Sequence, residues 1–339
     1  MQKSGTNLYD KELNNRNVKI ISLLSKGGIK PLERRIKAMK KMKKIITSDK
    51  YDLIHFNICN SIDLTYALIA KKSGVRKIVV HSHNSNVSGK LKSLKILAHN
   101  IFKVLLKNVP TDYVACSNEA ATWMFCKDKL KQVSIVNNSV DVERYLFNEE
   151  KRNNIRRKIN ADKDTFVIGN IARFSKEKNH LFLIDVFDEI CKIEKNVKLL
   201  LVGDGELKSN IKEVVKNKGI EDKVIFYGVT QDVPGVLSAM DCFVLPSIFE
   251  GKPVVSIEEQ ISGLYGVYSN NITKEVSLTN LIEYIDLDKG KEYWATKILE
   301  KKKYITQRKS MNDVIEEKGY GLKKLKESIE RIYNNNEQI

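Results

Sequence analysis

The 339-residue chain has no apolar run that reaches the roughly 18 to 20 residues of a membrane span. Its start, Met-Gln-Lys-Ser-Gly-Thr-Asn, also lacks the apolar core of a signal peptide. The five cysteines, at positions 59, 116, 126, 191 and 242, do not show the paired spacing of metal ligands. We therefore expect a cytoplasmic protein whose cysteines are buried, reduced thiols.

Acidic residues are absent between Asp63 and Asp112, a stretch that contains nine Lys or Arg. The first 150 residues hold 27 Lys/Arg and 13 Asp/Glu, so they carry +14 of the net charge of +17. Such a field attracts polyanions or an anionic membrane surface. The charge alone supports a hypothesis of nucleic-acid binding, because the basic segments hold few aromatic residues and no recognised nucleic-acid motif. We expect no nucleic-acid binding.

Two basic segments, 31–46 and 89–107, carry apolar residues at helical spacing with lysines and arginines between them. The pattern predicts two basic amphipathic helices. Each helix could lie on a bilayer interface, or it could pack its apolar stripe on a sheet as an ordinary crossover helix. Both alternatives stay open for 31–46. The long absence of acids favours the membrane for 89–107.

Short β-rich runs alternate with longer amphipathic ones in two series, separated by a polar, charged stretch near residues 148–163. The expected strands are Val18–Leu24, Leu53–Asn57, Lys77–His81, Tyr113–Cys116 and Val133–Asn137, then Phe166–Asn170, Lys198–Gly203, Val224–Gly228 and Cys242–Leu245. This alternation predicts an α/β fold with two Rossmann-like parallel-sheet domains facing a cleft. We place the domains at 1–150 and 151–318, followed by a helix within 319–339.

Glu250 and Glu258 are separated by seven residues, one in a loop after the strand Cys242–Leu245 and one in the helix that follows. Ligands bind at the carboxyl ends of parallel strands. Two carboxylates there can each chelate vicinal hydroxyls, and the amides of the helix N-terminus favour an anion. The pattern predicts a nucleotide-sugar site. The competing interpretation is a pair of solvated surface acids.

A basic loop with Arg173 and Lys178 follows the strand Phe166–Asn170. When a sugar leaves a nucleotide diphosphate, the diphosphate gains charge that fixed cations can neutralise. Charge-assisted hydrogen bonds contribute about 1.5–3 kcal/mol each. The alternative is that Arg173 and Lys178 are ordinary solvated side chains of a loop.

Two Asp-x-Asp sequences occur, 162–164 before a strand and 286–288 in a late helical region. We expect both to be chance matches and not a metal site.

Two further strand ends carry suitable residues. The strand at Lys198–Gly203 ends in Gly203-Asp204-Gly205, where glycine lets the backbone approach a ligand closely. The strand at Lys77–His81 ends near His81 and His83. A histidine there can donate to a sugar hydroxyl or orient an attacking one, and an ordinary loop histidine is the alternative.

Together these blocks resemble the retaining GT-B glycosyltransferases of glycosyltransferase family four, in the bacterial capsule and exopolysaccharide branch. The resemblance runs from about residue 10 to the C-terminus, and it implies that the final helix crosses back onto the N-terminal domain. By family pattern Glu250 lies near the donor sugar, Glu258 binds the ribose hydroxyls, and His83, with His81 competing, lies near sugar and acceptor. The implied catalytic set is Glu250, Arg173, Lys178 and His83, and the implied donor-binding set is Glu258, Gly203, Asp204, Gly205 and Gly251.

The resemblance implies transfer of a hexose or N-acetylhexosamine, with retention, from a UDP-linked donor to a lipid-linked or glycan acceptor at the inner membrane face. It also implies front-face attack without an enzymic nucleophile or a metal. Family members open with a strand, a glycine-rich loop, a helix and a second strand, about 40 to 50 residues that we expect this chain to lack. The alternative function is therefore an inactive, shortened remnant that only binds nucleotide.

Overall fold

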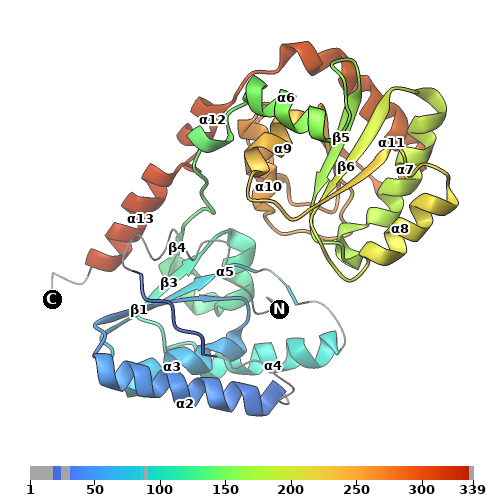
Figure 1. The fold of residues 1–339 in the computed structure, drawn as a ribbon. Coiled ribbons are helices and arrows are strands. Elements are labelled where there is room, and N and C mark those ends of the chain that lie inside the picture. Colours follow the sequence, from blue (N-terminus) through green and yellow to red (C-terminus); the bar gives the residue numbers. More distant parts are fainter. Residues whose placement is uncertain (1–17, 24–30, 85, 88–90, 336–339) are drawn as a thin grey trace. The chain divides into compact units, whose positions relative to one another are not determined.

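The computed structural model describes residues 18–23, 31–84, 86–87 and 91–335 (Figure 1). The chain divides into two compact units. The first unit extends to Asn137 and takes in the chain from Ser328 onward, and the second comprises Asn138–Glu327. These divisions differ from the boundaries after residues 150 and 318 that we expected.

A four-stranded parallel sheet forms the centre of the first unit, in the order β1-β2-β3-β4. Its strands are β1 (Leu53–Ile58), β2 (Lys77–Ser82), β3 (Asp112–Ala115) and β4 (Val133–Ile135). The helices are α2 (Pro31–Asp49), α3 (Leu64–Lys72), α4 (Lys92–Leu105) and α5 (Asn118–Met124), and α2 packs against α3. Strand β2 is buried along its whole length because it is central in the sheet.

Six parallel strands form the sheet of the second unit, in the order β10-β9-β8-β5-β6-β7. They are β5 (Phe166–Ile171), β6 (Val197–Val202), β7 (Val224–Gly228), β8 (Cys242–Leu245), β9 (Tyr265–Ser269) and β10 (Ile282–Ile285). The longer helices are α6 (Glu149–Lys158), α7 (His180–Ile193), α8 (Lys208–Asn217), α9 (Val233–Ala239), α10 (Val254–Ile261) and α11 (Gly290–Leu299). Separate apolar clusters cover the two faces of this sheet, as in a Rossmann-like fold.

The α/β class and the two parallel sheets are confirmed, and so are eight of the nine expected strands, with small shifts at their ends. Val18–Leu24 was wrong as a strand where it is described, because residues 18–23 pair with no strand of the described sheets. A β-strand needs a hydrogen-bonded neighbour, and apolar alternation alone does not supply one. Both amphipathic segments are helical, as α2 and α4.

The expected last helix is present as α13 (Leu322–Asn334), after the short α12 (Asn312–Glu317). The part of α13 from Ser328 onward belongs to the first unit, where the hydroxyl of Tyr333 lies 2.8 Å from Nδ1 of His55. Within the described ranges, no helix combines the length and the apolarity that crossing a bilayer demands.

All five cysteines are free thiols. Cys116, Cys191 and Cys242 are buried as expected, and Cys126 is partly exposed. Cys59 was wrongly expected to be buried: it follows the last residue of β1 and is exposed at the carboxyl edge of the first sheet.

Candidate active site

Three loops meet at the carboxyl edge of the second sheet. Because β5 lies between β8 and β6, the loops 172–179, 203–207 and 246–253 are neighbours in space. Backbone hydrogen bonds join them. The amide of Ile248 donates to the carbonyl of Glu177 at 2.8 Å, and the amide of Phe174 donates to the carbonyl of Asp204 at 3.1 Å. The sheet thus brings together residues that are more than 70 positions apart in sequence.

Lys178 and Glu250 form an ion pair across two of these loops. Their side chains are 23% and 12% exposed, so water screens the pair less than a surface ion pair. The hydroxyl of Ser247 donates to the same Glu250 oxygen at 3.1 Å. Asn179 adds a side-chain bond to the carbonyl of Pro246 at 3.2 Å. The structure therefore brings together two of the residues expected to hold the donor.

Arg173 lies in the same loop as Lys178 but is more exposed. Its guanidinium donates to the carboxylate of Glu206 at 2.9 Å, and the two side chains are 66% and 54% exposed. Exposed ion pairs contribute only about 0–1 kcal/mol. Arg173 can therefore leave Glu206 for a phosphate at small cost.

The glycine turn after β6 is required by the packing of the protein itself. A Cβ atom at Gly203, whose φ is +138°, would collide with the carbonyl of Ala172, and one at Gly205 would collide with the backbone of Phe174. Asp204 between them is exposed and lies 3.4 Å from Lys208. The sequence suggests only that these glycines leave room for a ligand; in the structure their close approach to the backbone of residues 172–174 is a second reason for them.

Glu258 is positioned by α10, which begins after Pro253. The side chain is partly buried, and burial raises the pKa of its carboxyl, although a hydrogen bond from Tyr145 and the charge of Arg144 oppose the shift. Glu250 and Gly251 precede this helix in the loop. The N-terminal amides of α10 therefore lie between the two carboxylate positions along the chain.

His180 belongs to this region and was not singled out from the sequence. It begins α7 directly after Lys178 and Asn179, and its ring packs 4.5 Å from that of Phe174. Burial, and then the charge of Lys178, lower its pKa to about 4, so the imidazole is neutral. Neither ring nitrogen has a hydrogen-bond partner in the described structure. The only signal in the sequence was its place at the end of the basic block.

In the first unit, three histidine rings form a row: His55 lies in the middle of β1, His81 near the end of β2, and His83 just after β2. The rings of His81 and His83 are 4.1 Å apart, and those of His55 and His81 are 5.4 Å apart. His83 is partly exposed and lies 2.8 Å from the side-chain oxygen of Asn57. Burial, followed by the two neighbouring histidines, lowers the pKa of His81 to about 3. Of the two competing histidines, His83 is the one that a ligand can reach.

The Asp-x-Asp sequences form turns. Asp162 accepts from the amide of Asp164 before β5, and Asp286 accepts from that of Asp288. The second pair follows β10 at a short 3₁₀ turn directly before α11, in the late helical region that was expected. No three His, Cys, Asp or Glu side chains cluster as metal ligands among the residues that the structure describes. Metal independence stays a prediction.

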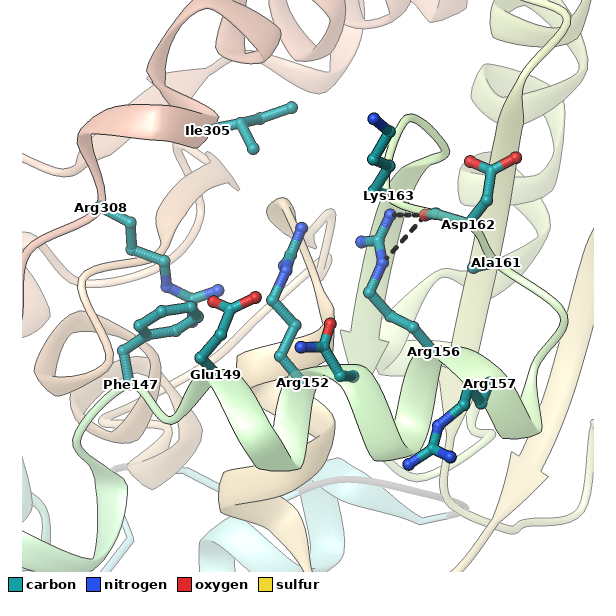
Figure 2. A pocket seen from close by; sticks show the side chains of 11 residues that line it. Phe147, Glu149, Arg152, Arg156, Arg157, Ala161, Asp162, Lys163, Ile305 and Arg308 are labelled. Carbon is teal, nitrogen blue, oxygen red and sulfur yellow. Dashed lines mark hydrogen bonds between the residues drawn. The ribbon is translucent and has the colours of Figure 1, made fainter.

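A cavity of about 590 Å³ lies in the second unit, but its position does not fit a donor site (Figure 2). Residues 161–163, which line it, lead into β5, so it opens near the amino edge of the sheet. Three of its four arginines are already engaged: Arg152 and Arg156 bind Asp241 and main-chain carbonyls, and Arg308 binds carbonyls and Ser262. These guanidiniums stabilise the C-terminal end of α9.

Comparison with known families agrees with this geometry. Residues 151–277 match the family described as glycosyl transferases group 1, and residues 4–118 match the family described as glycosyl transferase 4-like. Each unit thus contains a segment that resembles a glycosyltransferase family, and the fold is that of the GT-B glycosyltransferases.

Two curated relatives and one solved structure are similar to this chain over more than two thirds of its length. The chain is 29% identical over 235 residues to the putative glycosyltransferase EpsF of Bacillus subtilis, covering 68% of this chain and 61% of that protein. It is 26% identical over 272 residues to an Escherichia coli UDP-Gal:alpha-D-GlcNAc-diphosphoundecaprenol alpha-1,3-galactosyltransferase, covering 76% and 69%. Anabaena HepE, solved with UDP and glucose, superposes with a TM-score of 0.76 at 16% identity over 97% of this chain and 90% of that one.

Proposed function

We propose that the protein transfers a hexose or an N-acetylhexosamine from a UDP-linked donor to a lipid-linked or glycan acceptor, with retention of anomeric configuration, in bacterial capsule or exopolysaccharide synthesis. The observation that carries this proposal is the Lys178–Glu250 ion pair, with Ser247 beside it, next to the N-terminus of α10. A cation and a carboxylate at that edge suit a diphosphate joined to a hydroxylated sugar.

In the proposed mechanism each side chain of the second unit has a separate task. Glu258 accepts hydrogen bonds from the ribose hydroxyls, and Glu250 accepts them from the donor sugar. Arg173 and Lys178 bind the diphosphate and neutralise the charge that develops on it, with help from the amides of α10. The turn 203–205 and Gly251 bring main-chain groups close to the donor.

The acceptor hydroxyl attacks the anomeric carbon from the face that the diphosphate leaves. The new glycosidic C–O bond forms as the bond from that carbon to the phosphate oxygen breaks, and the departing phosphate takes the hydroxyl proton. His83, which is partly exposed, donates to a sugar hydroxyl or orients the attacking one. Fixed cations do the work of charge neutralisation, so we propose that no metal ion is needed.

We also propose that the enzyme works at the inner face of the cytoplasmic membrane. Helix α4 supports this because Leu94, Leu97, Ile101, Val104 and Leu105 are all exposed on it. Lys92 and Lys95 lie on the same helix, and the Escherichia coli relative is named for a lipid-diphosphate acceptor. Helix α2 supports it less, because Met42 and Ile46 are buried in the core and only Leu32 and Ile36 are exposed.

A nucleotide-release assay with UDP-glucose, UDP-galactose and UDP-N-acetylglucosamine tests the proposal, with a polyprenyl diphosphate sugar as acceptor. We expect one donor to be consumed and the new linkage to keep its anomeric configuration by NMR. Binding of UDP without turnover of any donor would instead support the remnant that only binds nucleotide. An inverted product would contradict retention.

A further inference from the structure

Lys252 has a buried ammonium two residues after Glu250. Its side chain is only 8% exposed and pairs with the carboxylate of Glu275 at 2.6 Å, which is itself 32% exposed. The ammonium also donates to the hydroxyl of Tyr320. Burial alone would lower the pKa of Lys252, but Glu275 and Tyr320 outweigh burial and raise it. Lys252 is therefore charged and held by two partners.

This ion pair joins the Glu250 loop to the segment after β9. Glu275 lies in a short 3₁₀ turn, Lys274–Val276, and the backbone of Glu250 pairs with that of Ile272 just before it. The loop 246–253 is thus attached to residues 272–275 through one backbone pairing and one ion pair. The attached loop ends at Pro253, directly before α10.

Tyr320 connects the attachment to the chain segments that leave the second unit. Its carbonyl accepts from the amide of Val140 at 3.0 Å, and Val140 pairs with Gly321. Val140 and Gly321 lie close in sequence to the two points where the chain passes between units, after Asn137 and after Glu327. The ammonium of Lys252 therefore links the Glu250 loop to the base of both connections.

We propose that Lys252 is a positioning residue for the donor sugar: through Glu275 and Tyr320 it holds the loop that carries Glu250 in the conformation that binds the sugar. This inference rests on the proposed function. An ordered loop keeps the binding-competent population high, and apparent affinity falls in proportion when that population falls. Removing the ammonium also leaves Glu275 without its partner in a partly buried place.

Lys252→Met keeps the length of the side chain and removes its charge. We expect the amides of residues 247–256 to exchange hydrogen about tenfold faster, and the KM for the UDP-sugar donor to rise about tenfold while kcat stays constant. Lys252→Arg should restore most of the KM. Glu275→Gln should raise the KM similarly, and the double variant Lys252→Met/Glu275→Gln should add little to either change.

Lys301 provides a matched control. It pairs with Glu283, and the two side chains are 10% and 33% exposed, nearly the same as Lys252 and Glu275. Lys301→Met should cost similar thermal stability and leave both the KM and the exchange of residues 247–256 unchanged. Equal effects of the two substitutions, or wild-type exchange in Lys252→Met, would overturn the proposal.

The exchange measurement separates the two levels of inference. If the wild-type protein consumes none of UDP-glucose, UDP-galactose and UDP-N-acetylglucosamine, the proposed function fails, while the exchange of residues 247–256 still decides whether Lys252 orders the loop. If the donor is consumed and only the loop exchange is unaffected, the proposed function stands and the positioning role is wrong.

Discussion

Lys178 donates to the Oε1 atom of Glu250, which also accepts from Ser247, so a single carboxylate oxygen joins two loops of the second unit. In the form described here, the ammonium expected to hold the diphosphate is bound to the carboxylate expected to hold the sugar. A donor that contacts both groups must either bind to the intact ion pair or separate its two members.

The first prediction concerns this pair. Lys178→Ala and Glu250→Ala should each lower nucleotide release at least about 100-fold, because one removes a cation from the leaving group and the other removes a contact to the sugar. Circular dichroism and the melting temperature should show that each variant still folds. Unchanged release in both variants would disprove the site assignment.

Lys218 is a suitable control for this prediction. It is also 23% exposed in the second unit, and it pairs with Asp185 and Asp188 at 2.9 and 3.3 Å. Lys218→Ala removes an ion pair of comparable burial away from the three site loops. Its nucleotide release should equal that of the wild type, which separates a lost charge at the site from a general loss of stability.

Much of the fold could be predicted because each strand carries its own signal. Runs such as Phe166–Ile171 and Cys242–Leu245 are short and mostly apolar, and each follows a polar residue, which is how strands buried on both faces look in a sequence. Val18–Leu24 has the same local pattern but pairs with no strand of the described sheets over residues 18–23. Pairing is a property of the neighbouring chain, and local periodicity does not contain it.

The sequence predicted which residues belong to the candidate site, but not which of their side chains contact one another. Arg173, Lys178 and Glu250 were identified by residue type at strand ends, and the sheet order then brings their loops together. The sequence could not show that Lys178 binds Glu250 while Arg173 binds Glu206, because both choices depend on side-chain distances. His180 and Lys252 escaped notice because their burial, and not their type, makes them unusual.

The second prediction compares two adjacent acids on α10. Glu258→Gln should weaken UDP binding about tenfold or more in calorimetry, because the carboxylate that would accept from the ribose hydroxyls is gone. Glu259→Gln should leave UDP binding unchanged. Glu259 is fully buried, burial raises its pKa well above the ordinary value, and its carboxyl accepts from Tyr268 at 2.8 Å. Equal losses in both variants would contradict the role of Glu258.

The third prediction is a loss of stability in acid that arises from His81. Its pKa is about 3 in the folded protein and about 6.5 unfolded, so the unfolded chain binds more protons between these values. The stabilising effect of the neutral ring is present above pH 6.5 and is lost as pH falls toward 3, by up to about 1.4 kcal/mol per pH unit. His81→Gln should remove that part of the slope.

Tryptophan fluorescence can measure this slope for the first unit separately. The chain has two tryptophans, Trp123 in the first unit and Trp294 in the core of the second. In a Trp294→Phe background, urea unfolding followed through Trp123 reports the first unit alone. An identical pH dependence with and without His81→Gln would show that another group is responsible.

The fourth prediction concerns the exposed apolar side chains of α4. Leu97 and Val104 are 57% and 60% exposed two helical turns apart, so the pair Leu97→Asp/Val104→Asp should leave the fold intact. The double substitution should lower the recovery of protein with floated liposomes about tenfold or more. The apolar side chains that would be buried in the bilayer are gone, and the new carboxylates repel anionic lipid. Lys92→Gln/Lys95→Gln should reduce recovery only with anionic liposomes. Ile193→Asp, at a 66% exposed site of the second unit, is the control and should change nothing. Equal recovery of the wild type and of Leu97→Asp/Val104→Asp would show that α4 does not enter the bilayer.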